Sequence, residues 1–121
     1  MKNYFIQRQP FTVPTDDNKL IEEHFGKTSI NAGEFSFAHM IAPPKWSESY
    51  QTPEFDEITF VFSGEKMVEV DGEKIILEKN QSIFIKRGTR VRYSNPFDEP
   101  CEYVSVCMPA FSMEKVNREN F

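Results

Sequence analysis

Residues that carry common catalytic chemistry are scarce in this chain. Its 121 residues include two histidines and two cysteines, and they contain no Gly-x-Ser-x-Gly elbow, glycine-rich phosphate loop or Cys-x-x-Cys pair. Nucleophilic hydrolysis, nucleotide binding and thiol exchange therefore have no supporting motif. Cys101 and Cys107 lie on one expected strand, where the usual rise separates them by about 20 Å, too far for a disulfide. We expect both to be reduced thiols.

Positive charge and long apolar runs are scarce as well. Lys and Arg total 14 against 19 for Asp and Glu, which gives a formal net charge of −5. This balance offers no basic surface for a phosphate backbone, so we expect no nucleic-acid partner. No apolar run approaches the roughly 20 residues that span a bilayer, and the start of the chain lacks the apolar region of a signal peptide. We expect a cytoplasmic protein without a membrane partner.

Aromatic residues, by contrast, are plentiful. They make up 14% of the chain, and twelve of them are Phe. Aromatic side chains suit the half-buried surface of a sheet, and a chain of this length holds one domain. Short strands with tight turns and no helices between them predict an all-β sandwich or barrel of the jelly-roll kind. The expected strands are Glu34–Ile41, Glu57–Phe62, Lys66–Val70, Lys74–Leu77, Ser82–Ile85, Thr89–Tyr93 and Glu102–Met108.

Turn and cap residues set the ends of these elements. Asp71-Gly72 between two strands predicts a two-residue hairpin with positive φ at both positions. Thr15 is a cap residue for a short helix that ends at Gly26, and Ser112 is one for a final helix, after which we expect the chain to fray. The chain thus divides into an amino-terminal extension packing on the barrel (1–30), a barrel (31–111) and a short carboxy-terminal helix or tail (112–121).

Two short frames carry a family motif. In the first, Glu57 is followed after six residues by Gly64. The second fits the pattern Gly-x5-Pro-x-Gly-x2-His-x3-Asn, with Gly88 and Asn95 in place. Its other positions hold Asn80, Lys86 and Val91 in place of Gly, Pro and His. In these frames the chain resembles the cupin superfamily, which implies a double-stranded β-helix barrel that often pairs as a homodimer.

Further segments narrow the resemblance. Several are similar to small cupins of polyketide and curacin-type pathways, some of which are described as cyclases, and Gly64–Gly88 is similar to the cupin of ethanolamine utilisation. The first set comprises Trp46-Ser-Glu48, Gln51-Thr-Pro53, Phe55-Asp-Glu57, Val91-Arg-Tyr93 and Val106-Cys-Met-Pro-Ala-Phe111.

The metal site that the resemblance implies is degenerate here. In a typical cupin, two His and the Glu of the first motif meet the His of the second at one divalent metal. Tyr50 or Gln51 and Thr52 stand near the first two histidines, and Val91 stands at the last. An apolar Val has no donor atom, and Thr is rarely a ligand of zinc or iron. We therefore expect no metal by the usual motif and leave the cofactor open.

The resemblance places a set of polar groups in the barrel cavity. Glu57 occupies the one motif position whose chemistry survives, and side chains two apart on a strand share a face, so Thr59 accompanies Glu57 and Tyr93 accompanies Val91. Gln51 enters from the preceding loop. A carboxylate in an apolar cavity is a candidate general acid or base, with Tyr93 to polarise an oxygen. The alternative is that Glu57 only hydrogen-bonds within the barrel.

Other candidates have a functional and a structural interpretation. His39 shares a face with Phe35, Phe37 and Ile41, so it is either a core histidine or a proton carrier in the cavity. With Gln51 and Glu57 it would make an unusual metal site. Trp46 and Tyr50 lie on the loop before the barrel. They either line its mouth and contact ligand, or they anchor the loop as an aromatic plug. Arg90 and Arg92 alternate with Val91 and Tyr93 and are expected in surface or interface ion pairs.

Three functions remain open at this point. The first is a small cupin that isomerises, cyclises or eliminates on a small carbonyl compound, with Glu57 or His39 moving the proton. The second is a non-catalytic small-ligand-binding or accessory cupin without metal. The third is a structural homodimer with a filled barrel. The fold alone does not choose among the three, because function depends on the residues of the site.

Overall fold

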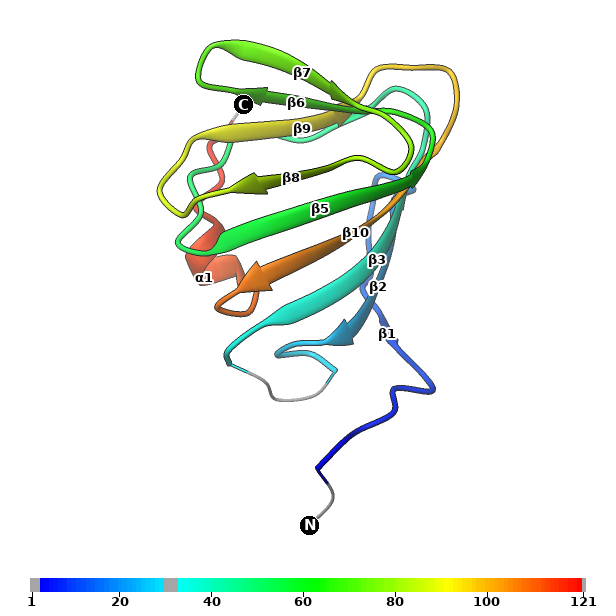
Figure 1. Cartoon of the computed structure of the whole chain (residues 1–121), viewed down its shortest axis with the longest axis vertical. Helices are drawn as coiled ribbons and strands as arrows, with labels where there is room; N and C mark the ends of the chain where they lie inside the picture. Colours follow the sequence, from blue (N-terminus) through cyan, green and yellow to red (C-terminus); the bar gives the residue numbers. More distant parts are fainter. Residues whose placement is uncertain (1–2, 30–32, 121) are drawn as a thin grey trace.

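Two antiparallel sheets face each other in the computed structural model, which describes residues 3–29 and 33–120 (Figure 1). The six-stranded sheet has the order β1-β2-β3-β10-β5-β8, and the four-stranded sheet has the order β4-β9-β6-β7. This is the all-β, jelly-roll architecture that the sequence predicts. The bounds are β1 Phe11–Thr12, β2 Leu20–Phe25, β3 Ser36–Ala42, β4 Trp46–Ser47, β5 Asp56–Ser63, β6 Lys66–Val70, β7 Glu73–Leu77, β8 Ser82–Ile85, β9 Val91–Asn95, β10 Cys101–Met108 and α1 Met113–Val116.

The seven strands expected from alternation are all present, with ends that differ by up to two residues. β6 and β7 form the expected hairpin, and its turn residues Asp71 and Gly72 have φ of 52° and 76°. The loop before the first motif contains one short strand, β4, which pairs with β9. Cys101 and Cys107 are free and buried at opposite ends of β10, as the strand assignment requires.

One expected element is wrong. The helix from Thr15 to Gly26 is absent, and β2 occupies half of this range and pairs with β3. Its apolar spacing fits a helix locally, but β3 would otherwise leave its backbone groups unpaired at that edge. β2 is thus a strand of the large sheet, while the expected domain boundary between residues 30 and 31 lies outside the described residues.

The structure explains why the motif positions hold the residues that they do. Gly64 has φ of 77°, and a Cβ there would lie 2.2 Å from the carbonyl oxygen of Pro100. Asn80, which replaces a motif glycine, keeps the left-handed backbone with φ of 67°, a conformation that Asn tolerates better than most residues. Asn95 is fully buried, and its amide nitrogen donates to the carbonyl oxygens of Ala42, Pro43 and Glu99. The second motif therefore fixes the loops at one end of the barrel.

The core lies between the two sheets. Its fully buried members include Val61, Val68, Val91 and Tyr103, which come from both sheets. The outer face of the large sheet also carries large apolar side chains, and Ile58, Phe62 and Phe84 are exposed on it. The face that lines the barrel is therefore not the only apolar face of this sheet.

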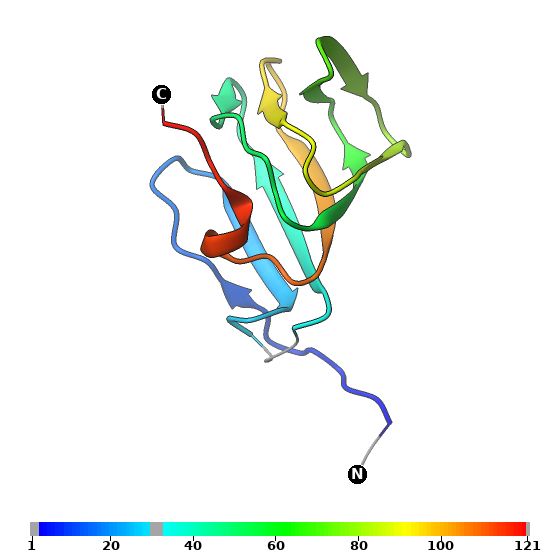
Figure 2. The ribbon, with the colours of Figure 1, turned by 90° about the vertical axis from the view of Figure 1, so that its left-hand side faces the viewer.

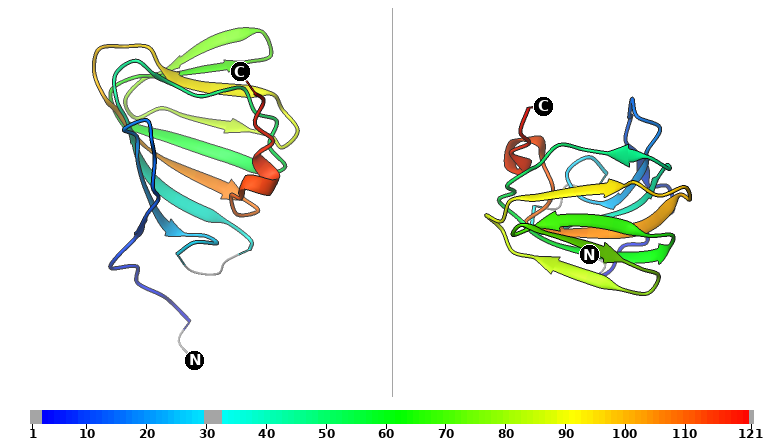
Figure 3. Two further views of the ribbon diagram at one scale, coloured as in Figure 1. Left: turned by 180° about the vertical axis from the view of Figure 1, so that it is seen from behind. Right: turned by 90° about the horizontal axis from the view of Figure 1, so that it is seen from above.

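The carboxy-terminal segment folds back on the barrel. The predicted helix α1 is present after Ser112, although the hydroxyl of Ser112 makes no capping hydrogen bond. Beyond it, Arg118 bridges to Gln51 and the amide of Glu119 donates to the carbonyl oxygen of Tyr50 at 2.8 Å. Figure 2 shows this segment running along one side of the barrel, and Figure 3 gives two further views. No helix among the described residues is long and apolar enough to cross a bilayer.

Candidate functional site

A cavity of about 110 Å³ lies inside the barrel. A water needs on the order of 10–15 Å³ measured in this way, so the space suits a small molecule and not a polymer. Its wall is largely apolar, with contributions from Phe55, Tyr103 and Phe111. The charged residues in the wall are Lys19, Glu23, Glu48, Glu57, Lys66 and Arg118.

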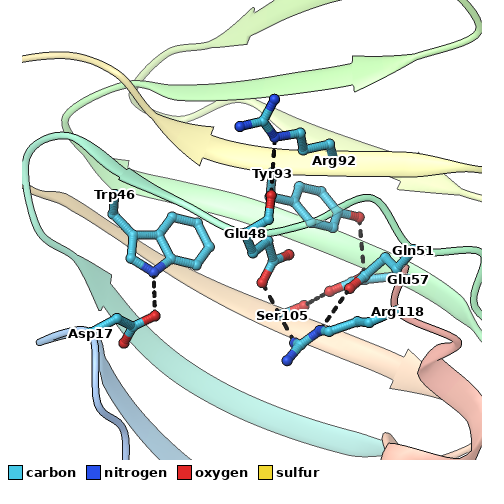
Figure 4. A network of polar contacts seen from close by, with 9 residues as sticks. All are labelled: Asp17, Trp46, Glu48, Gln51, Glu57, Arg92, Tyr93, Ser105 and Arg118. Carbon is cyan, nitrogen blue, oxygen red and sulfur yellow. Dashed lines mark hydrogen bonds and ion pairs between the residues drawn. The ribbon is translucent and has the colours of Figure 1, made fainter. Parts of the chain in front are cut away.

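Glu57 is held by two hydroxyl groups in the cavity wall. The hydroxyl of Tyr93 on β9 donates to Glu57 Oε1 at 3.0 Å, and Ser105 Oγ on β10 donates to Oε2 (Figure 4). Burial, and then the charge of Glu57, raise the pKa of Tyr93 well above its usual value, which keeps the phenol protonated as a donor. The carboxylate is therefore oriented by donors from both sheets.

A second carboxylate lies beside the carboxy-terminal segment. Glu48 Oε2 is 3.5 Å from Arg118 Nη2, and Arg118 Nε donates to Gln51 Oε1 at 3.3 Å (Figure 4). Burial raises the pKa of Glu48, while the positive charges of Lys19, Arg118 and Lys66 oppose that rise. Arg118 thus adds positive charge to the cavity from a part of the chain that carries no motif.

Two lysines complete the charge distribution. Lys66 begins β6 and is 3% exposed, and its Nζ lies 3.3 Å from the ring centroid of Tyr103. Lys19 Nζ lies 4.2 Å from the ring centroid of Trp46 and 5.4 Å from that of Tyr103. Burial lowers the pKa of both amines, that of Lys66 to about 7.

The structure brings together three of the predicted site residues, Gln51, Glu57 and Tyr93, in the cavity wall. Thr59 shares the inward face of β5 and is fully buried, but its Oγ1 has no hydrogen-bond partner in the described part of the chain. Trp46 is a buried core residue whose Nε1 donates to Asp17 Oδ2 at 2.7 Å.

The arginines of the second motif lie outside the barrel, as predicted. Arg90 pairs with Glu119 at 2.6 Å, and its guanidinium stacks 3.8 Å from the ring centroid of Tyr50. Tyr50 therefore contacts an external arginine and is not among the residues that line the cavity. Arg92 lies 3.6 Å from Glu69 and donates to the carbonyl oxygen of Glu48.

His39 does not join the cavity. Its side chain lies on the opposite face of β3, between Glu22 Oε1 at 2.8 Å from Nδ1 and Glu102 Oε2 at 2.6 Å from Nε2. The cavity face of β3 carries Ser36, Ala38 and Met40 instead. The expectation that the Phe-rich face points inward is wrong, because small side chains leave room for a cavity and the large ones cover the outer face.

The residues present do not fit the divalent metal of a typical cupin. His39 is on the other side of the sheet from Gln51 and Glu57, so the His-Gln-Glu set is not assembled. Val91, at the last ligand position, is fully buried in the core. Among residues 3–29 and 33–120, no group of three or more His, Cys, Asp or Glu side chains is placed to hold a metal ion. The cavity places Lys19, Lys66 and Arg118 beside its carboxylates, and a guanidinium or protonated amine has no lone pair for a metal.

Sequence reasoning missed several members of the site. Lys66 had a local signal, since it shares its strand face with the fully buried Val68. Ser105 had one too, because alternation along β10 puts it on the same face as Tyr103. The positions of Lys19, Glu48 and Arg118 depend on loops and on the carboxy-terminal segment, where no periodic pattern fixes a face.

Comparison with known proteins identifies the family. The model of the cupin domain, Cupin_2, matches residues 38–107. This chain belongs to the cupin family.

Two curated proteins are similar in sequence. The endoribonuclease YbeY of Myxococcus xanthus is 41% identical over 107 residues, which are 88% of this chain and 36% of that protein. The tetracenomycin polyketide synthase protein TcmJ of Streptomyces glaucescens is 28% identical over 83 residues, which are 68% of this chain and 56% of that protein. The chain therefore spans about a third of the first relative and about half of the second.

Solved structures confirm the fold, including the two neighbours that the sequence resemblance named. The polyketide cyclase RemF of Streptomyces resistomycificus has a TM-score of 0.73 at 14% identity, over 100% of this chain and 87% of that one. An ethanolamine utilisation protein of Salmonella typhimurium has a TM-score of 0.60 at 21% identity, over 77% and 71%. A histidine-to-glutamine variant of Streptomyces PAC13 with uridine has a TM-score of 0.76 at 12% identity, over 100% and 93%.

Proposed function

We propose that this cupin binds a small carbonyl-bearing organic molecule in its barrel and moves a proton on it, as an isomerase, cyclase or lyase does. The observation that carries the proposal is the position of Glu57. Its carboxylate lies in the wall of a cavity sized for a small molecule, and Tyr93 and Ser105 orient it. A positioned carboxylate of this kind accepts or donates a proton at a carbon next to a carbonyl group.

The charges around Glu57 support this chemistry. Removal of a proton next to a carbonyl group places negative charge on the carbonyl oxygen, and preorganised donors and cations stabilise that charge in a cavity that excludes bulk water. Arg118 and Lys19 supply positive charge in the same cavity. No metal is needed for this step, so the degenerate motif is compatible with it.

The names of two relatives are consistent with the same class of substrate. TcmJ is named as a polyketide synthase protein and RemF as a polyketide cyclase. The endoribonuclease named in the Myxococcus xanthus relative is not part of this proposal, since this chain spans 36% of that protein and has a net charge of −5.

A non-catalytic ligand-binding or accessory cupin is the alternative. Both carboxylate oxygens of Glu57 already accept a hydrogen bond, which is the arrangement that a structural residue would have. The two functions differ in what happens when Glu57 loses its charge and keeps its shape.

The test is deuterium exchange into cyclohexanone, a small ketone whose α-protons exchange slowly without a catalyst. We expect the protein to accelerate exchange in D₂O, followed by NMR, and Glu57→Gln to lose that acceleration by on the order of 10²-fold, the scale of a lost general base. The matched control is Glu78→Gln, because Glu78 is exposed and lies outside the cavity.

The stability of the same variant separates the two functions. A catalytic Glu57 predicts loss of exchange in a variant that remains folded. A structural Glu57 predicts a loss of roughly 1–3 kcal/mol in the free energy of unfolding from a mispaired buried group, with no exchange to lose. Absence of accelerated exchange in the unmodified protein would contradict the proposed function for this class of substrate.

A further inference from the structure

Lys66 is a buried amine that the proton-transfer step does not require. Its side chain is 3% exposed, yet its end lines the cavity. The Nζ atom lies over two aromatic rings, 3.3 Å from the centroid of Tyr103 and 4.4 Å from that of Tyr93. Within the described residues it makes no ion pair with a carboxylate and no hydrogen bond. A lysine that is buried, unpaired and open to a cavity is not explained by structure alone.

The surroundings of Lys66 favour the neutral amine. Burial lowers its pKa to about 7, and the positive charge of Lys19 acts in the same direction, while Glu57, Glu48 and Cys101 act against it. The faces of Tyr93 and Tyr103 attract the ammonium form. Desolvation and a second cation nearby both lower the pKa of a lysine, and this activates its amine as a nucleophile.

We propose that Lys66 is a nucleophilic amine that captures small aldehydes or ketones in the barrel cavity as Schiff bases. This inference rests on the proposed function only in taking the cavity as the site of a carbonyl compound. It adds a covalent step and names the carbonyl carbon as the atom that the protein attacks.

The step balances without an oxidant, reductant or cofactor. The lone pair of Lys66 Nζ forms the C–N bond, and the electrons of the C=O bond move to oxygen, which takes a proton. The resulting carbinolamine loses the nitrogen-bound proton and its hydroxyl group, the latter protonated to water, as the C=N bond forms. One carbonyl compound and one amine thus give one imine and one water.

The neighbouring groups fit the steps on either side. Tyr93 links the two centres, because its ring lies beside Lys66 Nζ and its hydroxyl donates to Glu57. A protonated imine withdraws electrons from the adjacent carbon more strongly than the parent carbonyl group does, so it makes the α-proton easier for Glu57 to remove. The Schiff base would therefore assist the proton transfer proposed above.

The test is reductive trapping on the unmodified protein. Cyclohexanone and sodium cyanoborohydride are added at pH 7, and the adduct is counted by intact mass and located by peptide mapping. At this pH a lysine with a pKa of about 7 has roughly a thousandfold more neutral amine than an ordinary lysine. We expect one adduct, at Lys66, formed before any adduct at the exposed lysines.

Variants and pH sharpen the test. Lys66→Met should lose the adduct, and Lys74→Met, which removes an exposed lysine of β7, should keep it. The rate of trapping at Lys66 should level off above about pH 7, whereas exposed lysines continue to gain reactivity up to about pH 10. Lys19→Met should move the Lys66 profile to higher pH, because it removes the neighbouring positive charge.

Each failure has its own signature. Adducts spread over exposed lysines with none at Lys66, or a Lys66 profile like that of an exposed lysine, would overturn the Schiff-base inference. If trapping at Lys66 persists in Glu57→Gln while no variant or parent protein exchanges deuterium, the inference stands and the proposed proton transfer fails. If exchange continues in Lys66→Met, proton transfer stands and the Schiff base is not part of it.

Discussion

Replacing Lys66 with Met should stabilise the protein at pH 7. The folded state lowers the pKa of Lys66 from 10.5 to about 7, and a shift of this size corresponds to about 5 kcal/mol of disfavoured charge. At pH 7 about half of the folded molecules are already neutral, so the penalty is about 4 kcal/mol. Met has a similar length and no charge, so Lys66→Met should be more stable than the parent protein by several kcal/mol.

The sign of the pH dependence follows from the same shift. The folded pKa lies below the unfolded one, so between pH 7 and 10 the unfolded chain binds more protons and the stability contributed by this position rises with pH. The advantage of Lys66→Met should therefore shrink by about 3–4 kcal/mol over that range. Urea unfolding of both proteins at intervals of pH measures the difference, with Lys74→Met as the exposed control.

Two results would refute this reasoning. A difference between parent protein and Lys66→Met that stays constant from pH 7 to 10 would mean that Lys66 keeps an ordinary pKa when folded. A Lys66→Met variant that is less stable than the parent at pH 7 would mean that the rings of Tyr93 and Tyr103 hold the ammonium form more strongly than burial disfavours it.

Three further predictions follow from other parts of the fold. Gly64→Ala should destabilise the protein by at least about 2 kcal/mol more than Gly72→Ala in urea unfolding, since both have positive φ but only Gly64 would bring a Cβ onto Pro100; equal losses would show that the loop yields. Burial alone would lower the pKa of His39, but the hydrogen bonds that its protonated ring donates to Glu22 and Glu102 raise this pKa above 6.5, so the stability lost in His39→Gln should be full below pH 6.5 and fade as the pH rises through the raised value. The exposed Ile58, Phe62 and Phe84 lead us to propose a homodimer through the outer face of the large sheet, so light scattering should give a dimer that Phe62→Glu converts to monomer, and a parent protein that is monomeric at micromolar concentration would reject it.

Short-range patterns were sufficient for most of the barrel. Strand alternation and turn residues act locally, so β5 to β10 could be assigned from the sequence with small errors at their ends. Gly64 and Asn95 were correctly placed by the motif, because their roles are fixed by backbone conformation and by buried carbonyl groups. β2 was missed because the free edge of β3, which lies in another part of the chain, decides its conformation.

The face of a strand was predictable only where one of its two faces is polar. On β3 both faces are apolar, and the cavity face is the one with smaller side chains. A rule that turns the largest apolar residues inward assumes a filled core, and it fails beside a cavity. The same rule turned His39 inward, toward the core or the cavity, and placed no emphasis on Ser36 or Ala38.

The loss of the metal motif could be predicted, but what takes its place could not. Val91 and Thr52 show from sequence that donor atoms are missing. The basic residues that line the cavity are Lys66, Lys19 and Arg118, which lie on one strand, one loop and the carboxy-terminal segment. They share the cavity with the carboxylates of Glu48 and Glu57. Because these residues are spread over the chain, only the folded structure reveals that they share one space. The chemistry that we propose for this space uses an amine and a carboxylate in place of a Lewis acid.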